Sequence, residues 1–71
     1  MKNKLTISQQ IILDCVKKYY ETHYDSPTLL ELCEMAGLKT KSTVQVHLQN
    51  LQKKGYLQIE PRIKRGIIIL K

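Results

Sequence analysis

The chain has 71 residues, a formal net charge of +6 and two cysteines. This length is enough for one small domain over residues 1–71 and leaves little room for a separate catalytic domain. No apolar run approaches the length of a membrane-spanning helix, and no signal peptide is visible. The cysteines, with 17 residues between them, match neither a disulfide nor a zinc pattern, so we expect a reducing cytosol.

The positive charge is concentrated in the second half of the chain. Residues 1–38 carry a net charge of −1, whereas residues 39–71 carry eight basic residues against Glu60 alone, a net charge of +7. A basic surface of this kind is typical of a nucleic-acid-binding protein. A solvated surface without a partner would have the same composition, so charge alone leaves both interpretations open.

The first helix is predicted over about Ile7 to Thr22. Thr6 and Gln9 have the spacing of a capping box at its start, and Pro27 disfavours helical geometry in the residue before it. Apolar residues at helical spacing define its buried side, namely Ile12, Leu13, Val16 and Tyr20.

The second helix is predicted to start at Thr28, which forms a further capping-box pattern with Glu31. Gly37 stands where the end of a helix needs a left-handed backbone. The turn over residues 36–40 is too short for the helices on either side to run antiparallel along their whole length. It therefore predicts a steep crossing, as in the helix-turn-helix arrangement that places one helix in a DNA groove.

The third helix is predicted over about Lys41 to Lys54, with Thr40 as its N-cap, Ser42 as a competing cap and Gly55 as its C-cap. Its buried side consists of Val44, Leu48 and Leu51, and at about 100° per residue the opposite side consists of Ser42, Val46, Gln49 and Lys53, flanked by Thr43 and Gln45.

A β-hairpin is predicted to close the chain, with strands over Tyr56 to Glu60 and Gly66 to Leu70. Its loop carries Arg62, Lys64 and Arg65. Alternation would turn Ile67 and Ile69 to the core and leave Ile68 and Leu70 outward, either as a partner surface or packed under the first helix. Three helices and a basic hairpin predict a mainly α, winged helix-turn-helix domain.

The outward side of the third helix has the chemistry of base recognition. Glutamine can bond bidentately to adenine, serine and threonine bond to several bases, and an exposed valine can meet a thymine methyl group. An isolated exposed apolar residue is also normal on any surface. We expect base contacts from Ser42, Thr43, Gln45, Val46 and, further along the helix, Gln49.

The basic residues around this helix and in the hairpin loop are candidates for contacts with the DNA backbone. Such contacts position a protein on the duplex without specifying sequence, and an arginine in a wing can also enter the minor groove. In the alternative interpretation, the lysines around the helix only make the surface soluble, and the basic loop is a charged edge that prevents sheet aggregation. The candidates are Lys39, Lys41, Lys53, Lys54, Arg62, Lys64 and Arg65.

No arrangement of nucleophile and base is visible, so we expect neither enzyme activity nor a cofactor, a metal or a small-molecule substrate. The leading hypothesis is sequence-specific binding of double-stranded DNA in transcriptional regulation. A winged-helix module for protein interaction, with Val46 and Ile68 as contacts, is one alternative. Non-specific DNA binding by an accessory protein of a mobile element is another.

Six short motifs in order resemble the N-terminal DNA-binding domain of the LexA repressors. These are Leu5-Thr6 with Gln9-Gln10, Ser26-Pro27-Thr28 with Glu31-Leu32, Gly37-Leu38, His47-Leu48 with Leu51, Lys54-Gly55 with Ile59, and Arg65-Gly66-Ile67. The resemblance runs nearly end to end. It implies a bacterial, cytoplasmic and nucleoid-associated regulator, a repressor that can act as a dimer on DNA, whose third helix enters the major groove.

The resemblance implies that bases are read by the residues at Thr40, Ser42, Thr43, Gln45 and Val46, and this sequence departs from the family there. The family's Ser-Pro-Asn becomes Thr40-Lys41-Ser42, and its paired glutamates become Gln45-Val46. We therefore expect a target other than the usual SOS operator. The family also carries a C-terminal dimerisation and self-cleavage domain, so we expect this chain to be either a stand-alone regulator or an excised domain.

Overall fold

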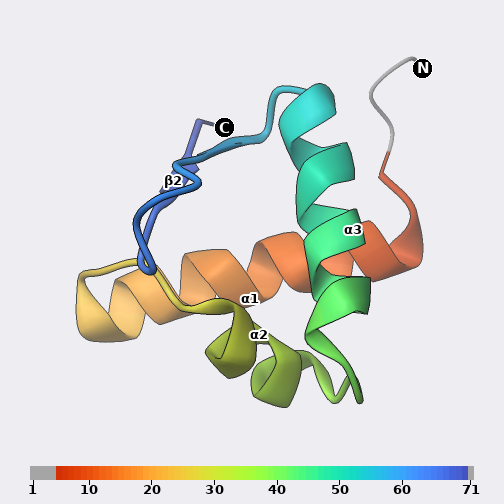
Figure 1. The fold of residues 1–71 in the computed structure, drawn as a ribbon, viewed down its shortest axis with the longest axis horizontal. Helices are drawn as coiled ribbons and strands as arrows, with labels where there is room; N and C mark the ends of the chain where they lie inside the picture. The colour runs from red at the N-terminus through yellow and green to blue at the C-terminus, as the bar shows by residue number, and fades with distance from the viewer. Residues whose placement is uncertain (1–4, 71) are drawn as a thin grey trace.

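Three helices and a β-hairpin follow one another in the predicted order. The computed structural model describes residues 5–70. α1 runs across the molecule, α3 stands across its N-terminal half, and the hairpin lies over its C-terminal half (Figure 1). The predicted three-helix winged helix-turn-helix is confirmed, with α1 at Ile7–His23, α2 at Leu29–Ala36, α3 at Lys41–Lys53, β1 at Leu57–Ile59 and β2 at Ile67–Ile69.

The first two helices begin with the capping boxes that the sequence predicts. At α1, the Thr6 hydroxyl accepts the Gln9 N–H at 3.1 Å and the Gln9 side chain accepts the Thr6 N–H at 3.2 Å. At α2, Thr28 and Glu31 exchange the equivalent bonds at 3.2 and 2.8 Å. Each box satisfies two N–H groups that lack a partner within the helix. Thr28 is the N-cap, so α2 itself starts one residue later than predicted.

The helix ends depend on left-handed residues. α1 continues one residue beyond its predicted end and stops at Tyr24, which has φ 58°. Gly37, at φ 71°, ends α2 as predicted. α3 ends at Lys53, one residue earlier than predicted, and Lys54 takes the cap position assigned to Gly55. The reason is that Gly55, at φ 81°, lies one position further on, where its N–H and that of Tyr56 return to the last turn.

The core lies where the three helices meet the hairpin. The predicted buried side of α3 is confirmed, since Val44, Leu48 and Leu51 are at most 1% exposed. On α1, Tyr19 is buried and Tyr20 is only half-buried, the reverse of the predicted pattern. Tyr20 instead reaches the hairpin edge, where its hydroxyl donates to the Ile67 carbonyl. The buried apolar cluster comprises Ile12, Leu13, Val16, Leu32, Cys33, Val44, Leu48, Leu51, Leu57 and Ile67.

The two strands are antiparallel, with Gln58 opposite Ile68, and each is three residues long rather than the predicted five. The strand register buries Ile67 and exposes Ile68, as the alternation predicts. Gly66 is required at the bend because a Cβ atom there would lie 2.8 Å from the Glu60 carbonyl oxygen. The segment over residues 60–66, here called the wing, therefore closes tightly onto itself.

Candidate nucleic-acid interface

The turn between α2 and α3 fixes where the outward face of α3 begins. The Leu38 N–H donates to the Cys33 carbonyl at 3.0 Å, and the Cys33 thiol donates to the Leu38 carbonyl at 2.9 Å. Leu38 also packs against the core. These contacts hold the turn from inside, so that α3 begins at the surface with Lys41, Ser42 and Thr43 exposed, while Val44 packs into the core.

The outward face of α3 carries exposed amide, hydroxyl and apolar groups. Val46 is 54% exposed, although valine is well suited to a core. No acidic side chain occurs in the helix. The exposed residues on or beside this face are Ser42, Thr43, Gln45, Val46, Gln49 and Lys53. The face therefore offers hydrogen-bond donors and acceptors to a partner without repelling phosphate.

Thr40 and Thr43 form a pair at the start of α3. The Thr40 hydroxyl accepts the Thr43 N–H at 3.4 Å, which identifies Thr40 rather than Ser42 as the N-cap. The two hydroxyl oxygens lie 3.1 Å apart, so one donates to the other. One hydroxyl proton of the pair remains available to a partner. Thr40 thus has a structural role in addition to any contact with a base.

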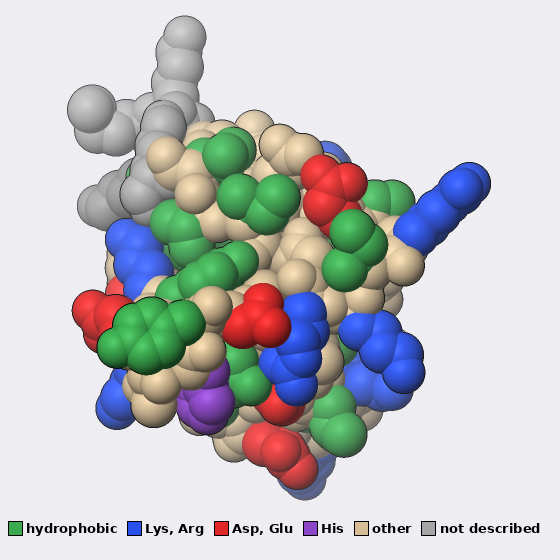
Figure 2. Space-filling view, turned by 90° about the vertical axis from the view of Figure 1, so that its left-hand side faces the viewer, with side chains coloured by type: hydrophobic (Ala, Val, Ile, Leu, Met, Phe, Trp, Pro, Cys, Tyr) green, Lys and Arg blue, Asp and Glu red, His purple; other side chains and the backbone are tan. Residues whose placement is uncertain are grey.

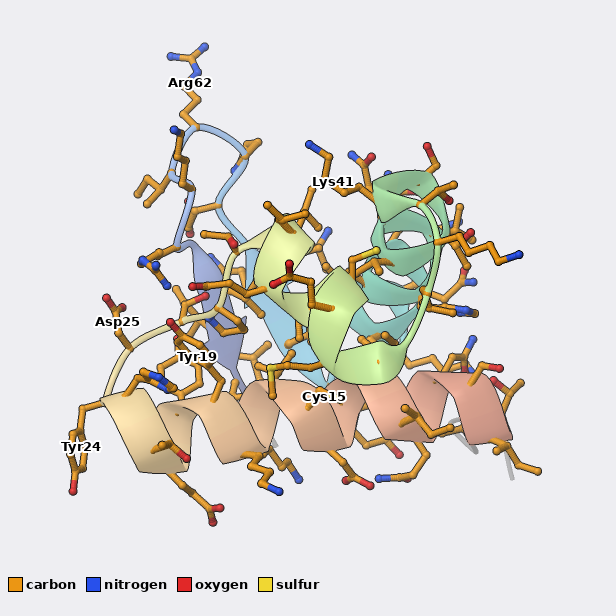
Figure 3. The ribbon with its side chains drawn as sticks, turned by 90° about the horizontal axis from the view of Figure 1, so that it is seen from below. Cys15, Tyr19, Tyr24, Asp25, Lys41 and Arg62 are labelled. Carbon is orange, nitrogen blue, oxygen red and sulfur yellow. The ribbon has the colours of Figure 1, made fainter. Side chains whose placement is uncertain are left out.

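A groove of about 470 Å³ separates α3 from the wing. Its α3 side includes Gln45, Gln49 and Gln52, and its wing side includes Arg62 and Lys64. Figure 3 shows Arg62 at the tip of the wing and Lys41 at the start of α3 extending to the same side, away from α1. The basic wing and the amide side chains of α3 therefore border one groove, and Lys41 extends to the same side of the molecule.

The basic candidates separate into two groups. Lys39, Lys41, Lys53, Arg62 and Lys64 are exposed. Lys54 is half-buried, and its ammonium donates to the Gln9 side-chain oxygen at 2.7 Å, which ties the end of α3 to the start of α1.

Arg65 forms an ion pair that lies outside the reach of local sequence patterns. Its guanidinium donates to both Glu31 carboxylate oxygens, at 2.8 and 3.2 Å. The Arg65 hydrogen bonds, followed by that from the Thr28 N–H, lower the pKa of Glu31 to about 2. The same pairing, with help from Tyr19, raises the pKa of Arg65. In the sequence, the acidic residue nearest to Arg65 is Glu60. Its partner in the structure, Glu31, lies 34 residues earlier in the chain.

Within residues 5–70, no group of three or more His, Cys, Asp or Glu side chains could hold a metal ion. None of the helices in this part of the chain is long and apolar enough to cross a membrane.

A helix-turn-helix followed by a basic wing, with an amide-rich third helix, is the arrangement of the DNA-binding class of winged helix-turn-helix domains. The model of a family described as LexA DNA binding domain matches residues 2–66. The chain belongs to this family.

Several relatives are named LexA repressor. The chain is 43% identical over 70 residues to that of Caldicellulosiruptor saccharolyticus, covering 99% of this chain and 35% of the relative. It is 34% identical over 70 residues to that of Alcanivorax borkumensis, with coverage of 99% and 34%. It is 43% identical over 67 residues to that of a Geobacillus species, with coverage of 94% and 32%. The chain thus spans about a third of the length of these relatives.

Proposed function

We propose that this domain binds double-stranded DNA in a sequence-specific manner and acts as a transcriptional repressor. The composition of the α3 face carries the proposal, because Ser42, Gln45 and Val46 are exposed together where an ordinary surface helix would carry Glu and Lys. Membership of the LexA DNA-binding family and the repressor relatives support the same function.

In this proposal α3 enters the major groove and its N-terminal half reads bases. Ser42, Thr43, Gln45 and Val46 contact base edges, with Gln49 further along. Thr40 positions Thr43 and shares its hydroxyl hydrogen bonds. The exposed cations hold the phosphate backbone, namely Lys39, Lys41, Lys53, Arg62 and Lys64. We assign Lys54 and Arg65 to holding the domain's shape, because each hydrogen-bonds a side chain distant in sequence.

Selection from a random duplex pool tests this function directly. We expect recovery of a defined half-site, and of two half-sites about 10 bp apart if the domain pairs on DNA. Failure to enrich any sequence at low salt would contradict sequence-specific binding. Retention of all duplexes without enrichment would instead support non-specific DNA binding.

Gln45→Ala and Lys53→Ala form a matched pair on one helix. Gln45→Ala should relax base preference at one position, since a good bidentate contact discriminates by about 1–3 kcal/mol. Lys53→Ala should weaken binding to all sequences about equally. Competition binding against single-base variants of the selected site distinguishes the two. If both variants keep the full base preference, Gln45 does not determine specificity.

A further inference from the structure

One guanidinium fastens the base of the wing to the helical body. Arg65 lies near the end of the wing, directly before Gly66 and β2. Besides its two bonds to Glu31, it donates to the Tyr19 hydroxyl and to the Ser26 carbonyl, both at 2.9 Å. Figure 2 shows acidic and basic side chains lying side by side on the face that contains the end of α1 and the hairpin. Three segments of the chain thus converge on Arg65.

The backbone next to Arg65 is attached to the same loop. The Ile67 N–H donates to the Ser26 hydroxyl at 3.0 Å, and Ser26 is only 1% exposed. The Ser26 hydroxyl in turn donates to the Pro27 carbonyl at 3.0 Å. The C-terminal end of the wing is therefore held by the segment that leads into α2, while Arg62 stands at its tip (Figure 3).

Glu31 takes part both in the N-terminal cap of α2 and in the ion pair with Arg65. The oxygen that accepts the Thr28 N–H at 2.8 Å, and so caps α2, also accepts from Arg65 at 2.8 Å. Its other oxygen accepts from the Tyr19 hydroxyl at 3.1 Å. Tyr19 is itself stacked on His23, with ring centroids 3.9 Å apart. One carboxylate therefore connects α1, the start of α2 and the wing.

These contacts give Arg65 a role different from that of Arg62 and Lys64. A bidentate arginine–carboxylate pair is directional, and the guanidinium of Arg65 already donates hydrogen bonds to Tyr19, Ser26 and Glu31. Across residues 5–70, no ion pair is formed by Arg62 or Lys64, and both are exposed. The tip of the wing is thus available to a phosphate, whereas its base is occupied.

We propose that Arg65 and Glu31 are positioning residues, which form a clamp that sets the wing against α3 so that Arg62 and Lys64 reach the DNA backbone. The inference rests on the proposed function and adds how the second contact surface is held. The clamp fixes the outer wall of the groove between α3 and the wing. Its loss should therefore remove the contribution of the wing while leaving the α3 face in place.

Glu31→Gln tests the clamp because it retains the shape and the capping oxygen of Glu31 but presents an amide to the guanidinium. We expect duplex affinity to fall by about tenfold at 0.1 M salt, and the salt slope to decrease by almost 2, as two phosphate contacts are lost. This loss should occur although the variant is more positive. If Arg65 instead contacts phosphate, the replacement frees it and affinity rises, which would overturn the proposal.

A double-mutant cycle separates positioning from a general loss of charge. The pair Arg62→Ala and Lys64→Ala should weaken the wild-type domain but change binding less than twofold in the Glu31→Gln background. Glu34→Gln is the matched control, since it removes an exposed acid from the same helix and should not weaken binding. Equal costs of the wing alanines in both backgrounds would refute the clamp.

The clamp can also be tested without DNA. A result that refutes the clamp is therefore distinct from a result that refutes the proposed DNA binding. Backbone amide relaxation of residues 62–64 should show greater mobility in Glu31→Gln and in Arg65→Lys, which keeps the charge but not the fork. Unchanged relaxation in both folded variants would overturn the clamp, whatever the wild-type domain binds. A wild-type domain that binds no duplex would refute only the DNA-binding role.

Discussion

A residue of left-handed backbone lies at or just beyond the C-terminal cap of each helix, and one of these residues is not a glycine. Gly37 and Gly55 have φ of 71° and 81°, whereas Tyr24 has φ of 58°. The left-handed conformation costs a side chain about 1–2 kcal/mol because its Cβ approaches the following carbonyl. Tyr24 is 89% exposed, so little packing offsets this cost. The end of α1 therefore carries local strain that the ends of α2 and α3 avoid.

Tyr24→Gly should stabilise the domain. The replacement removes the backbone strain and almost no buried surface, and the greater freedom of glycine in the unfolded chain offsets part of the gain. We expect a gain of up to about 1 kcal/mol, which raises Tm by several degrees in a domain of this size. Thermal denaturation followed by circular dichroism measures the change. Glu21→Gly, at an exposed right-handed position in the same helix, is the control and should lower Tm.

Gly37→Ala should have the opposite effect. A Cβ atom at this position would meet nothing within 4 Å, so the replacement creates no collision and changes only the backbone preference. We expect a loss of about 1 kcal/mol. The same denaturation experiment applies. An alanine that leaves Tm unchanged would show that the turn between α2 and α3 relaxes to another conformation at no cost.

At the scale of the elements, the attachment of the wing to α2 depends on an ionised carboxylate. The pKa of Glu31 is lowered from 4.5 to about 2 in the folded protein, chiefly by Arg65. A lowered pKa means that the folded state binds the proton less tightly than the unfolded state. The stabilisation from Glu31 is therefore complete above about pH 4.5 and is lost as the pH falls towards 2.

Because folding lowers the pKa of Glu31, the effect of Glu31→Gln on stability should depend on pH. Glutamine does not titrate, so the Tm difference between wild type and variant should be largest above pH 5 and should shrink between pH 4.5 and 2. Paired thermal denaturations across this range measure it. A Tm difference that stays constant with pH would show that the variant loses packing or hydrogen bonds rather than the ion pair.

The sequence predicts those elements that depend on local patterns and misses contacts between distant segments. Capping boxes and the core stripe of α3 involve residues three to seven positions apart, and both are confirmed. Hydropathy at helical spacing could not decide between Tyr19 and Tyr20, because each has one apolar ring and one polar hydroxyl. The pairing of Arg65 with Glu31 depends on how the hairpin packs against α2, which no local pattern encodes.

The candidate site also has a part that the sequence predicts and a part that it does not. The exposed face of α3 could be predicted because the buried positions Val44, Leu48 and Leu51 fix the opposite side of the helix. The groove beside this face could not be predicted, because it depends on tertiary structure. The same holds for the hydrogen bonds that tie Lys54 to Gln9 and Arg65 to Glu31. Neither level specifies which base each side chain would contact.

At the scale of the whole molecule, the uneven distribution of charge predicts a steep dependence of DNA binding on salt. Five exposed cations border the α3 face or lie at the tip of the wing: Lys39, Lys41, Lys53, Arg62 and Lys64. If each neutralises one phosphate, the logarithm of the binding constant should fall with the logarithm of salt concentration with a slope of about −4.5. Affinity should then decrease by ~500-fold between 50 and 200 mM salt.

Fluorescence anisotropy of a labelled duplex over this salt range measures the slope. Replacing the wing cations by alanine shows how much of the slope comes from the wing and how much from the lysines around α3. Arg62→Ala with Lys64→Ala should reduce the slope to about −2.7, since the three lysines of α3 and its turn remain. A slope that these replacements leave unchanged would place the wing away from the backbone. In that case the lysines around α3 would carry the electrostatic contact, and the clamp would stabilise the fold without contributing to binding.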